Sequence, residues 1–146
     1  MTSMRHSRPR SSLLSSNEPP AGHARVAMAA GESWSIRPDV LALLQDRGNR
    51  LVLSAASAWE IAIKYALGKL ALPEPPSDYV SSRLSSGGVE SLAVNHRHAL
   101  RVASLAAHHN DPFDRLLIGQ ASIERLTIVT ADQAFERYDV SLLPLW

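Results

Sequence analysis

Apolar and polar residues alternate along residues 38–146 in a pattern that predicts helices and strands in turn. Short apolar or alternating runs predict strands at 51–53, 89–94, 126–130 and 141–146. Between them, Ser, Asn, Asp or Pro residues begin most of the predicted helices, which cover 38–47, 54–67, 77–86, 95–105, 111–124 and 131–137. Because strands alternate with helices, the pattern predicts an α/β fold with a parallel sheet flanked by helices.

The first 35 residues follow neither pattern. Ser, Pro, Arg and His dominate them, and Glu18 and Glu32 are their only acids. We therefore expect a disordered or non-native segment at 1–35 and a folded domain at 36–146. The composition of the segment also fits an organellar transit peptide, an ill-defined start or a disrupted reading frame.

Composition narrows the possible chemistry. A chain of 146 residues that is 45% hydrophobic can bury one core, and without cysteine it has no disulfide, thiolate metal site or cysteine nucleophile. The net charge of +1 gives no sign of nucleic-acid binding by the chain as a whole. No apolar run approaches the roughly 18 residues that span a bilayer, and no secretory signal is present, so we expect a cytoplasmic protein without membrane contact.

Four carboxylates are expected at one edge of the sheet. The helices of a parallel sheet begin at the carboxyl ends of the strands, and Glu60, Asp111, Asp114 and Asp132 all fall near such beginnings. Hard cations such as Mg²⁺ and Mn²⁺ prefer oxygen ligands. A metal held there can activate water against a phosphodiester, so the sequence predicts metal-dependent hydrolysis.

Each of these acids also has a purely structural explanation. Ser57 and Glu60 fit a capping box, Asp111 and Asp132 can cap the helices that follow them, and Asp114 is favoured by the dipole of its helix. His108, His109 and Asp111 fit either a small metal cluster or, better, a solvated loop. A group of basic residues could contact phosphates or could simply lie on solvated helix faces. Its members are His96, Arg97, His98, Arg101 and Arg115. We expect the core to include Trp59, Phe113 and Phe135.

Three blocks of sequence resemble a known family: SAASAWEIAIK at 54–64, HNDPFDRLLI at 109–118 and VTAD at 129–132. Their order and spacing are similar to those of the PIN-domain toxins of bacterial type II toxin–antitoxin pairs, of the VapC type. The resemblance covers 38–146. It implies a PIN-like fold and an endoribonuclease that uses Mg²⁺ or Mn²⁺ to cut RNA, is silenced by a cognate antitoxin protein and forms homodimers.

The same resemblance assigns roles to individual residues. By matching motifs, Glu60, Asp114 and Asp132 hold the metal, with Asp114 at the centre of the site. Thr130 positions water or metal through its hydroxyl, and Asp111 supports the metal ligands without binding the metal itself. Arg97, Arg101 and Arg115 are the candidate RNA contacts.

One element of the family pattern is not matched. The family begins with a hydrophobic strand that ends in a metal-binding aspartate, whereas here residues 12–16 are the only similar run and no aspartate precedes Asp39. The N-terminal strand is therefore expected to be missing or degenerate, which should weaken metal binding and stability. Two alternatives follow: a catalytically inactive protein that still binds an antitoxin or dimerises, and a different Mg²⁺-dependent phosphohydrolase that uses the same acids.

Overall fold

The computed structural model describes residues 25–28, 37–108 and 110–145. These residues form five strands, five α-helices and two short 3₁₀ helices. In chain order the elements are β1 (Arg25–Met28), α1 (Pro38–Gln45), β2 (Arg50–Ser54), α2 (Ala55–Ala66), α3 (Pro76–Ser86), β3 (Glu90–Leu92), α4 (His96–Arg101), η1 (Val102–Ser104), α5 (Pro112–Glu124), β4 (Thr127–Thr130), η2 (Gln133–Arg137) and β5 (Ser141–Pro144).

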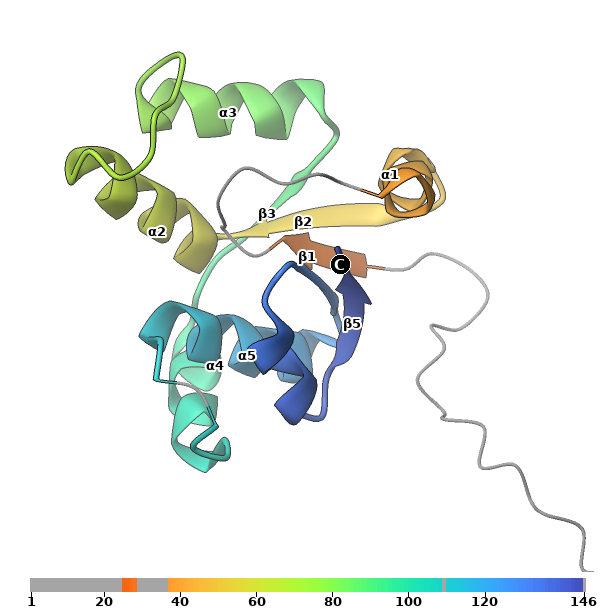
Figure 1. Cartoon of the computed structure of the whole chain (residues 1–146), viewed down its shortest axis with the longest axis vertical. Coiled ribbons are helices and arrows are strands. Elements are labelled where there is room, and N and C mark those ends of the chain that lie inside the picture. The colour runs from red at the N-terminus through yellow and green to blue at the C-terminus, as the bar shows by residue number, and fades with distance from the viewer. Residues whose placement is uncertain (1–24, 29–36, 109, 146) are drawn as a thin grey trace, which may run out of the picture.

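The five strands form one parallel sheet in the order β3-β2-β1-β4-β5 (Figure 1). Ala27 of β1 lies opposite Val52 of β2 on one side and Ile128 of β4 on the other. Each pair of consecutive strands is joined through at least one helix, as parallel strands require. The prediction of a parallel α/β fold is therefore confirmed.

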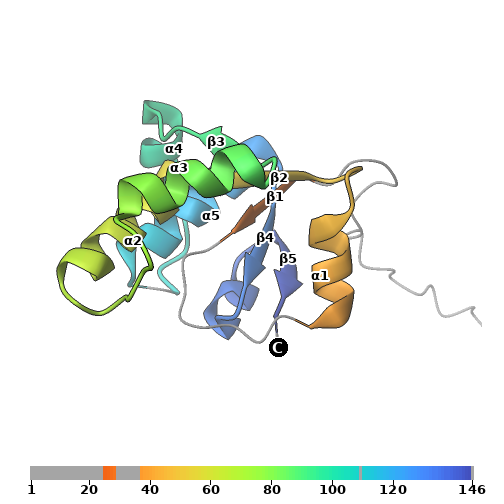
Figure 2. The same ribbon diagram turned by 90° about the horizontal axis from the view of Figure 1, so that it is seen from above.

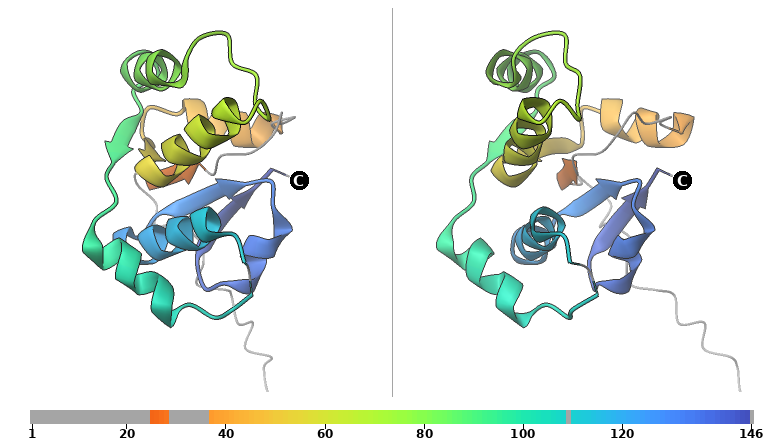
Figure 3. Two further views of the ribbon diagram at one scale, coloured as in Figure 1. Left: turned by 90° about the vertical axis from the view of Figure 1, so that its left-hand side faces the viewer. Right: turned by 60° about the vertical axis from the view of Figure 1, so that its left-hand side comes forward.

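Helices cover both faces of the sheet. Helix α1 lies on one side of it and α5 on the other (Figures 2 and 3). On the α1 side, Val40 packs with Val129 and Leu145. On the α5 side a larger core forms from Val52, Leu117, Ile118, Ala121, Leu126, Ile128, Phe135 and Tyr138. The alternation of side chains along β4, with Ile128 on one face and Val129 on the other, supplies both cores at once.

Strand β1 occupies the central position of the sheet. It falls within the segment 1–35, and its sequence, Arg-Val-Ala-Met, contains no Asp or Glu. Of the two expectations for the first strand, missing or degenerate, the structure has the second: a four-residue strand without an acid. Residues 12–16, the run that the sequence offered instead, lie outside the described residues.

Several predicted elements are shorter than expected. The strand expected at 89–94 is β3, Glu90–Leu92, and the helix expected at 95–105 ends at Arg101 and continues only as the 3₁₀ turn η1. The helix expected at 131–137 is the 3₁₀ helix η2, which begins two residues later than expected because Asp132 is its N-cap. Among the described residues, no helix combines the length and apolar character needed to cross a membrane.

Candidate functional site

The carboxyl edge of the sheet gathers the beginnings of the helices that follow the strands. Ser54 ends β2 and caps α2, Thr130 ends β4 just before Asp132 caps η2, and Asp111 caps α5, whose far end leads into β4. The structure thus brings the neighbourhoods of all four predicted acids to one edge, as the topology of a parallel sheet requires.

Glu60 is buried within α2, with 7% of its surface exposed. Lys64, one turn later in the helix, brings its Nζ to 3.0 Å from Glu60 Oε1. The capping box expected from Ser57 and Glu60 does not form, because α2 begins earlier and Ser54 accepts the cap hydrogen bond from the Ala56 N–H. Glu60 is therefore a buried helix-interior carboxylate, and the ammonium of Lys64 offsets part of the cost of burying its charge.

Asp111 and Asp114 lie at the start of α5. Asp111 Oδ1 accepts hydrogen bonds from the backbone N–H of Phe113 at 2.9 Å and of Asp114 at 3.3 Å. The capping role of Asp111 is thus confirmed, and this cap fixes the backbone at Asp114. Asp114 is half-buried in the first turn of the helix, where the helix dipole favours a negative charge.

Thr130 and Asp132 form the third part of this edge. Asp132 is exposed, and its Oδ1 accepts a hydrogen bond from the Ala134 N–H at 2.8 Å. Its own N–H donates to Thr130 Oγ1 at 3.0 Å, and Thr130 is 1% exposed. The Thr130 hydroxyl therefore positions Asp132 through the backbone.

The acids share an edge without forming a complete metal centre. Among the residues that the structure describes, no three His, Asp or Glu side chains are arranged so that they could hold a metal ion. The alternative cluster of His108, His109 and Asp111 stays a prediction, because His109 lies outside the described residues; His108 stacks edge-on against Tyr138. The carboxylates of this edge are the oxygen donors that Mg²⁺ and Mn²⁺ prefer, but the described residues do not gather three of them around one point, so we assign no catalytic step to a metal here.

The predicted RNA contacts differ in how firmly the fold holds them. Arg97 is exposed in the first turn of α4, whereas Arg101 donates to Ser104 Oγ at 2.7 Å and to Ser122 Oγ at 3.3 Å. Arg115 donates to the backbone carbonyls of residues 102, 105 and 106 and to the Tyr138 hydroxyl. RNA contact by these arginines stays a prediction, but Arg101 and Arg115 have structural partners that already explain their placement.

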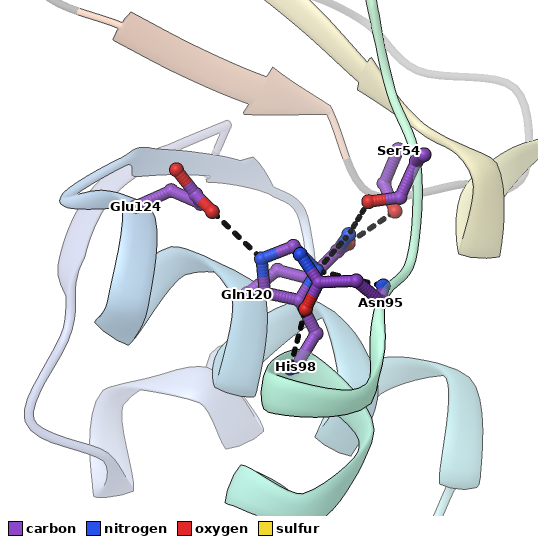
Figure 4. Close-up of polar contacts among 6 residues, drawn as sticks. Ser54, Asn95, His98, Gln120 and Glu124 are labelled. Atoms are coloured by element: carbon purple, nitrogen blue, oxygen red, sulfur yellow. Dashed lines mark hydrogen bonds and ion pairs between the residues drawn. The ribbon is translucent and has the colours of Figure 1, made fainter.

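A buried polar network behind this edge was missed by sequence reasoning (Figure 4). Ser54 Oγ is hydrogen-bonded to Gln120 Oε1, and Gln120 Nε2 donates to the Ala93 carbonyl at 3.3 Å and to His98 Nδ1 at 3.4 Å. Ser54 and Gln120 are fully buried and His98 is 1% exposed. The network ties the start of α2 to α5 and to the segment that leads into α4.

The hydrogen bonds around His98 fix the position of its proton. The Asn95 N–H donates to His98 Nδ1 at 3.2 Å, so Nδ1 is an acceptor and Nε2 carries the hydrogen that Glu124 Oε1 accepts at 2.7 Å. His98 is thus a core residue, and the solvated helix face considered for it is wrong. Two signals in the sequence pointed here: the spacing of Asn95 and His98, which allows reciprocal capping, and a glutamine inside the apolar stretch 116–121 of α5.

The expectation that Trp59 belongs to the core is wrong. Trp59 is 59% exposed, although its ring meets that of Phe113 edge-on with centroids 4.9 Å apart. Phe113 is half-buried and Phe135 is 1% exposed, so only Phe135 of the three aromatic residues is fully in the core. Both aromatic residues are next to the acids in sequence, since Trp59 precedes Glu60 and Phe113 precedes Asp114.

Comparison with known proteins agrees with this geometry. The family model described as the PIN domain matches residues 25–141. Ribonuclease VapC16 of Mycobacterium tuberculosis is 46% identical over 79 residues, which are 54% of this chain and 52% of that protein, so the match spans about half the length of this curated relative.

Two solved structures share the fold. A chain of VapBC2 from Rickettsia felis, bound to a DNA fragment from their promoter, superposes with a TM-score of 0.62 at 17% identity over 82% of this chain and 98% of its own. A chain of VapBC-1 from nontypeable Haemophilus influenzae gives 0.54 at 16% identity over 83% and 98%. At these identities the two structures support the fold alone.

Proposed function

The chain belongs to the PIN-domain family, and from this premise we propose that it is a toxin-type endoribonuclease that hydrolyses RNA phosphodiester bonds. The observation that carries the proposal is the placement of buried Glu60 and half-buried Asp114 at the carboxyl edge of a PIN-type sheet. The similarity to Ribonuclease VapC16 supports the same activity. The proposed partner is a cognate antitoxin protein, as in the VapBC complexes of like fold, and the proposed assembly is a homodimer.

The proposed cofactor is Mg²⁺ or Mn²⁺, since PIN-domain ribonucleases of the VapC type depend on a metal ion. Asp114 is the proposed central ligand, with Glu60 and Asp132 beside it and Asp111 as support. Because β1 contributes no acid and no three described side chains gather into a metal site, we expect weak affinity and low activity. Cleavage should therefore need a high concentration of the cation.

Replacing Asp114 by Asn tests the proposed activity. The amide keeps the size of the side chain but loses its charge, so we expect cleavage of a fluorescent single-stranded RNA to fall at least about tenfold at every Mg²⁺ or Mn²⁺ concentration. Asp78→Asn is the matched control, because Asp78 is also an acid in the first turn of a helix, α3, and should change nothing. Equal cleavage by the two variants, or cleavage that persists in a chelator, would remove Asp114 from the site.

A second candidate function is a catalytically inactive PIN-domain protein that still binds an antitoxin. The observation that favours it is the ion pair between Lys64 and Glu60: a carboxylate that already has a cation beside it is a poorer ligand for another. No cleavage of RNA by the full chain at any metal concentration, together with an unaltered fold, would select this candidate over the first.

Replacing Lys64 by Met measures how strongly that ion pair competes with a metal. Because Lys64 is partly exposed, we expect only a modest gain, about two- to fivefold tighter binding of Mn²⁺ in isothermal titration calorimetry. Lys69→Met removes an exposed lysine just beyond α2 and should leave the affinity unchanged. If Mn²⁺ binds both variants and the unaltered chain alike, Glu60 is not one of its ligands.

A further inference from the structure

The aromatic pair Trp59 and Phe113 lies at the edge that carries the candidate acids. The two side chains come from the two helices that meet there, α2 and α5, which pack against each other. Their rings are inclined at 69° with centroids 4.9 Å apart, which is the edge-to-face arrangement that aromatic rings favour. Phe113 therefore supports the indole of Trp59 from one side.

The exposure of Trp59 is large for a residue held in this way. Fully 59% of its surface is open to solvent, while the adjacent Glu60 is 7% exposed and Phe113 is half-buried. An exposed indole on a folded helix keeps a large apolar surface in water, where it is available to a flat apolar ligand. The part of the indole that Phe113 does not contact is the surface that a ligand could reach.

The side chains at this edge are mostly acidic, so a nucleic acid bound here needs contacts other than those to its phosphates. Glu60, Asp111, Asp114 and Asp132 are acidic, and the nearest basic side chain on α2, Lys64, is paired with Glu60. Arg115, the base next to Asp114, donates to backbone carbonyls inside the fold. Attraction of a phosphate backbone is therefore weak here, and another contact must contribute to binding.

We propose that Trp59 is a stacking platform for an unpaired base of single-stranded RNA. The proposal rests on the proposed ribonuclease function, because it places the base beside the edge where the phosphodiester would be cut. Unpaired bases stack on exposed aromatic side chains, whereas the bases of a duplex are already stacked on one another. The site therefore selects single strands over duplexes and tolerates differences in base sequence.

Binding measured in the Asp114→Asn chain tests the platform separately from cleavage. With a fluorescent oligoadenylate in the absence of metal, Trp59→Leu is expected to weaken binding roughly tenfold, while Trp59→Phe retains most of the affinity. Leu67→Ala removes another exposed apolar side chain, 63% exposed at the end of α2, and should have no effect. Equal melting temperatures of the variants would show that the fold is intact.

Two further measurements identify the contact as stacking. In a chain with Trp34→Phe and Trp146→Phe, Trp59 is the one remaining tryptophan, and its fluorescence should be quenched by oligoadenylate but not by a duplex of the same length. The affinity should depend only weakly on salt, since few phosphates are neutralised. Both results can hold even if the chain never cleaves RNA, so a failure of the proposed activity is distinguishable from a failure of the platform.

Other outcomes would overturn the proposal. Unchanged RNA affinity in Trp59→Leu, or equal affinity for duplex and single strand, would exclude base stacking. A steep salt dependence with no effect at Trp59 would assign binding to phosphate contacts. Loss of binding to a protein partner in Trp59→Leu with unaltered RNA binding would make this surface a protein-docking site instead.

Discussion

Replacing Gln120 by Leu is expected to lower the free energy of unfolding by about 2–4 kcal/mol, although the two side chains are similar in size. Gln120 is fully buried and is hydrogen-bonded to Ser54 Oγ, the Ala93 carbonyl and His98 Nδ1. Leucine makes none of these bonds, so the buried Ser54 hydroxyl loses its acceptor, and His98 Nδ1 keeps only the Asn95 N–H as a donor. Urea denaturation followed by circular dichroism measures the loss.

The matched control for this prediction is Gln45→Leu. Gln45 is the last residue of α1 and is exposed, so the same chemical change there should stay within about 0.5 kcal/mol of the unaltered chain. A loss below about 1 kcal/mol at Gln120 would mean that water or rearranged side chains replace the missing bonds, and that the network does not hold α2 against α5.

The fold could be predicted from the sequence because its signals are local. Asn95 and Asp111 cap the helices that follow them, and the apolar runs at 51–53 and 126–130 mark two central strands. The central strand β1 could not be predicted in the same way. It is four residues long, and its partners β2 and β4 lie about 25 and 100 residues further along the chain, so tertiary pairing and not local pattern defines it.

The candidate site was predictable only as far as topology alone decides it. That Glu60, Asp114 and Asp132 fall at one sheet edge follows from where their helices begin. Whether they gather around one metal ion does not follow, because that depends on how the helices that carry them pack. The prediction that Trp59 lies in the core is wrong for the same reason: helical spacing places it on an apolar stripe, but among the described residues only the edge-on ring of Phe113 is seen to stack with it, and 59% of its surface stays exposed.

The polar network around His98 links the two helices that carry Glu60 and Asp114. Ser54 caps the helix that carries Glu60, and Gln120 belongs to the helix that carries Asp114, so one hydrogen bond links the supports of both acids. These contacts are made by neutral side chains below the surface, where the cost of an unmade bond is high. A substitution in the network should therefore alter the edge even though it touches none of the acids.

Replacing Arg115 by Met is expected to cost about 2–4 kcal/mol of folding free energy and to leave RNA affinity unchanged. The guanidinium donates to the carbonyls of Val102, the first residue of η1, at 3.1 Å and of Ala106 at 2.9 Å, so it holds η1 and the loop after it against α5. Methionine keeps the length and apolar stem of the side chain but donates nothing. Arg97→Met, at an exposed position, should change stability by less than about 0.5 kcal/mol. Unchanged stability of Arg115→Met with weakened binding to oligoadenylate would instead make Arg115 an RNA contact, as the sequence alone suggested.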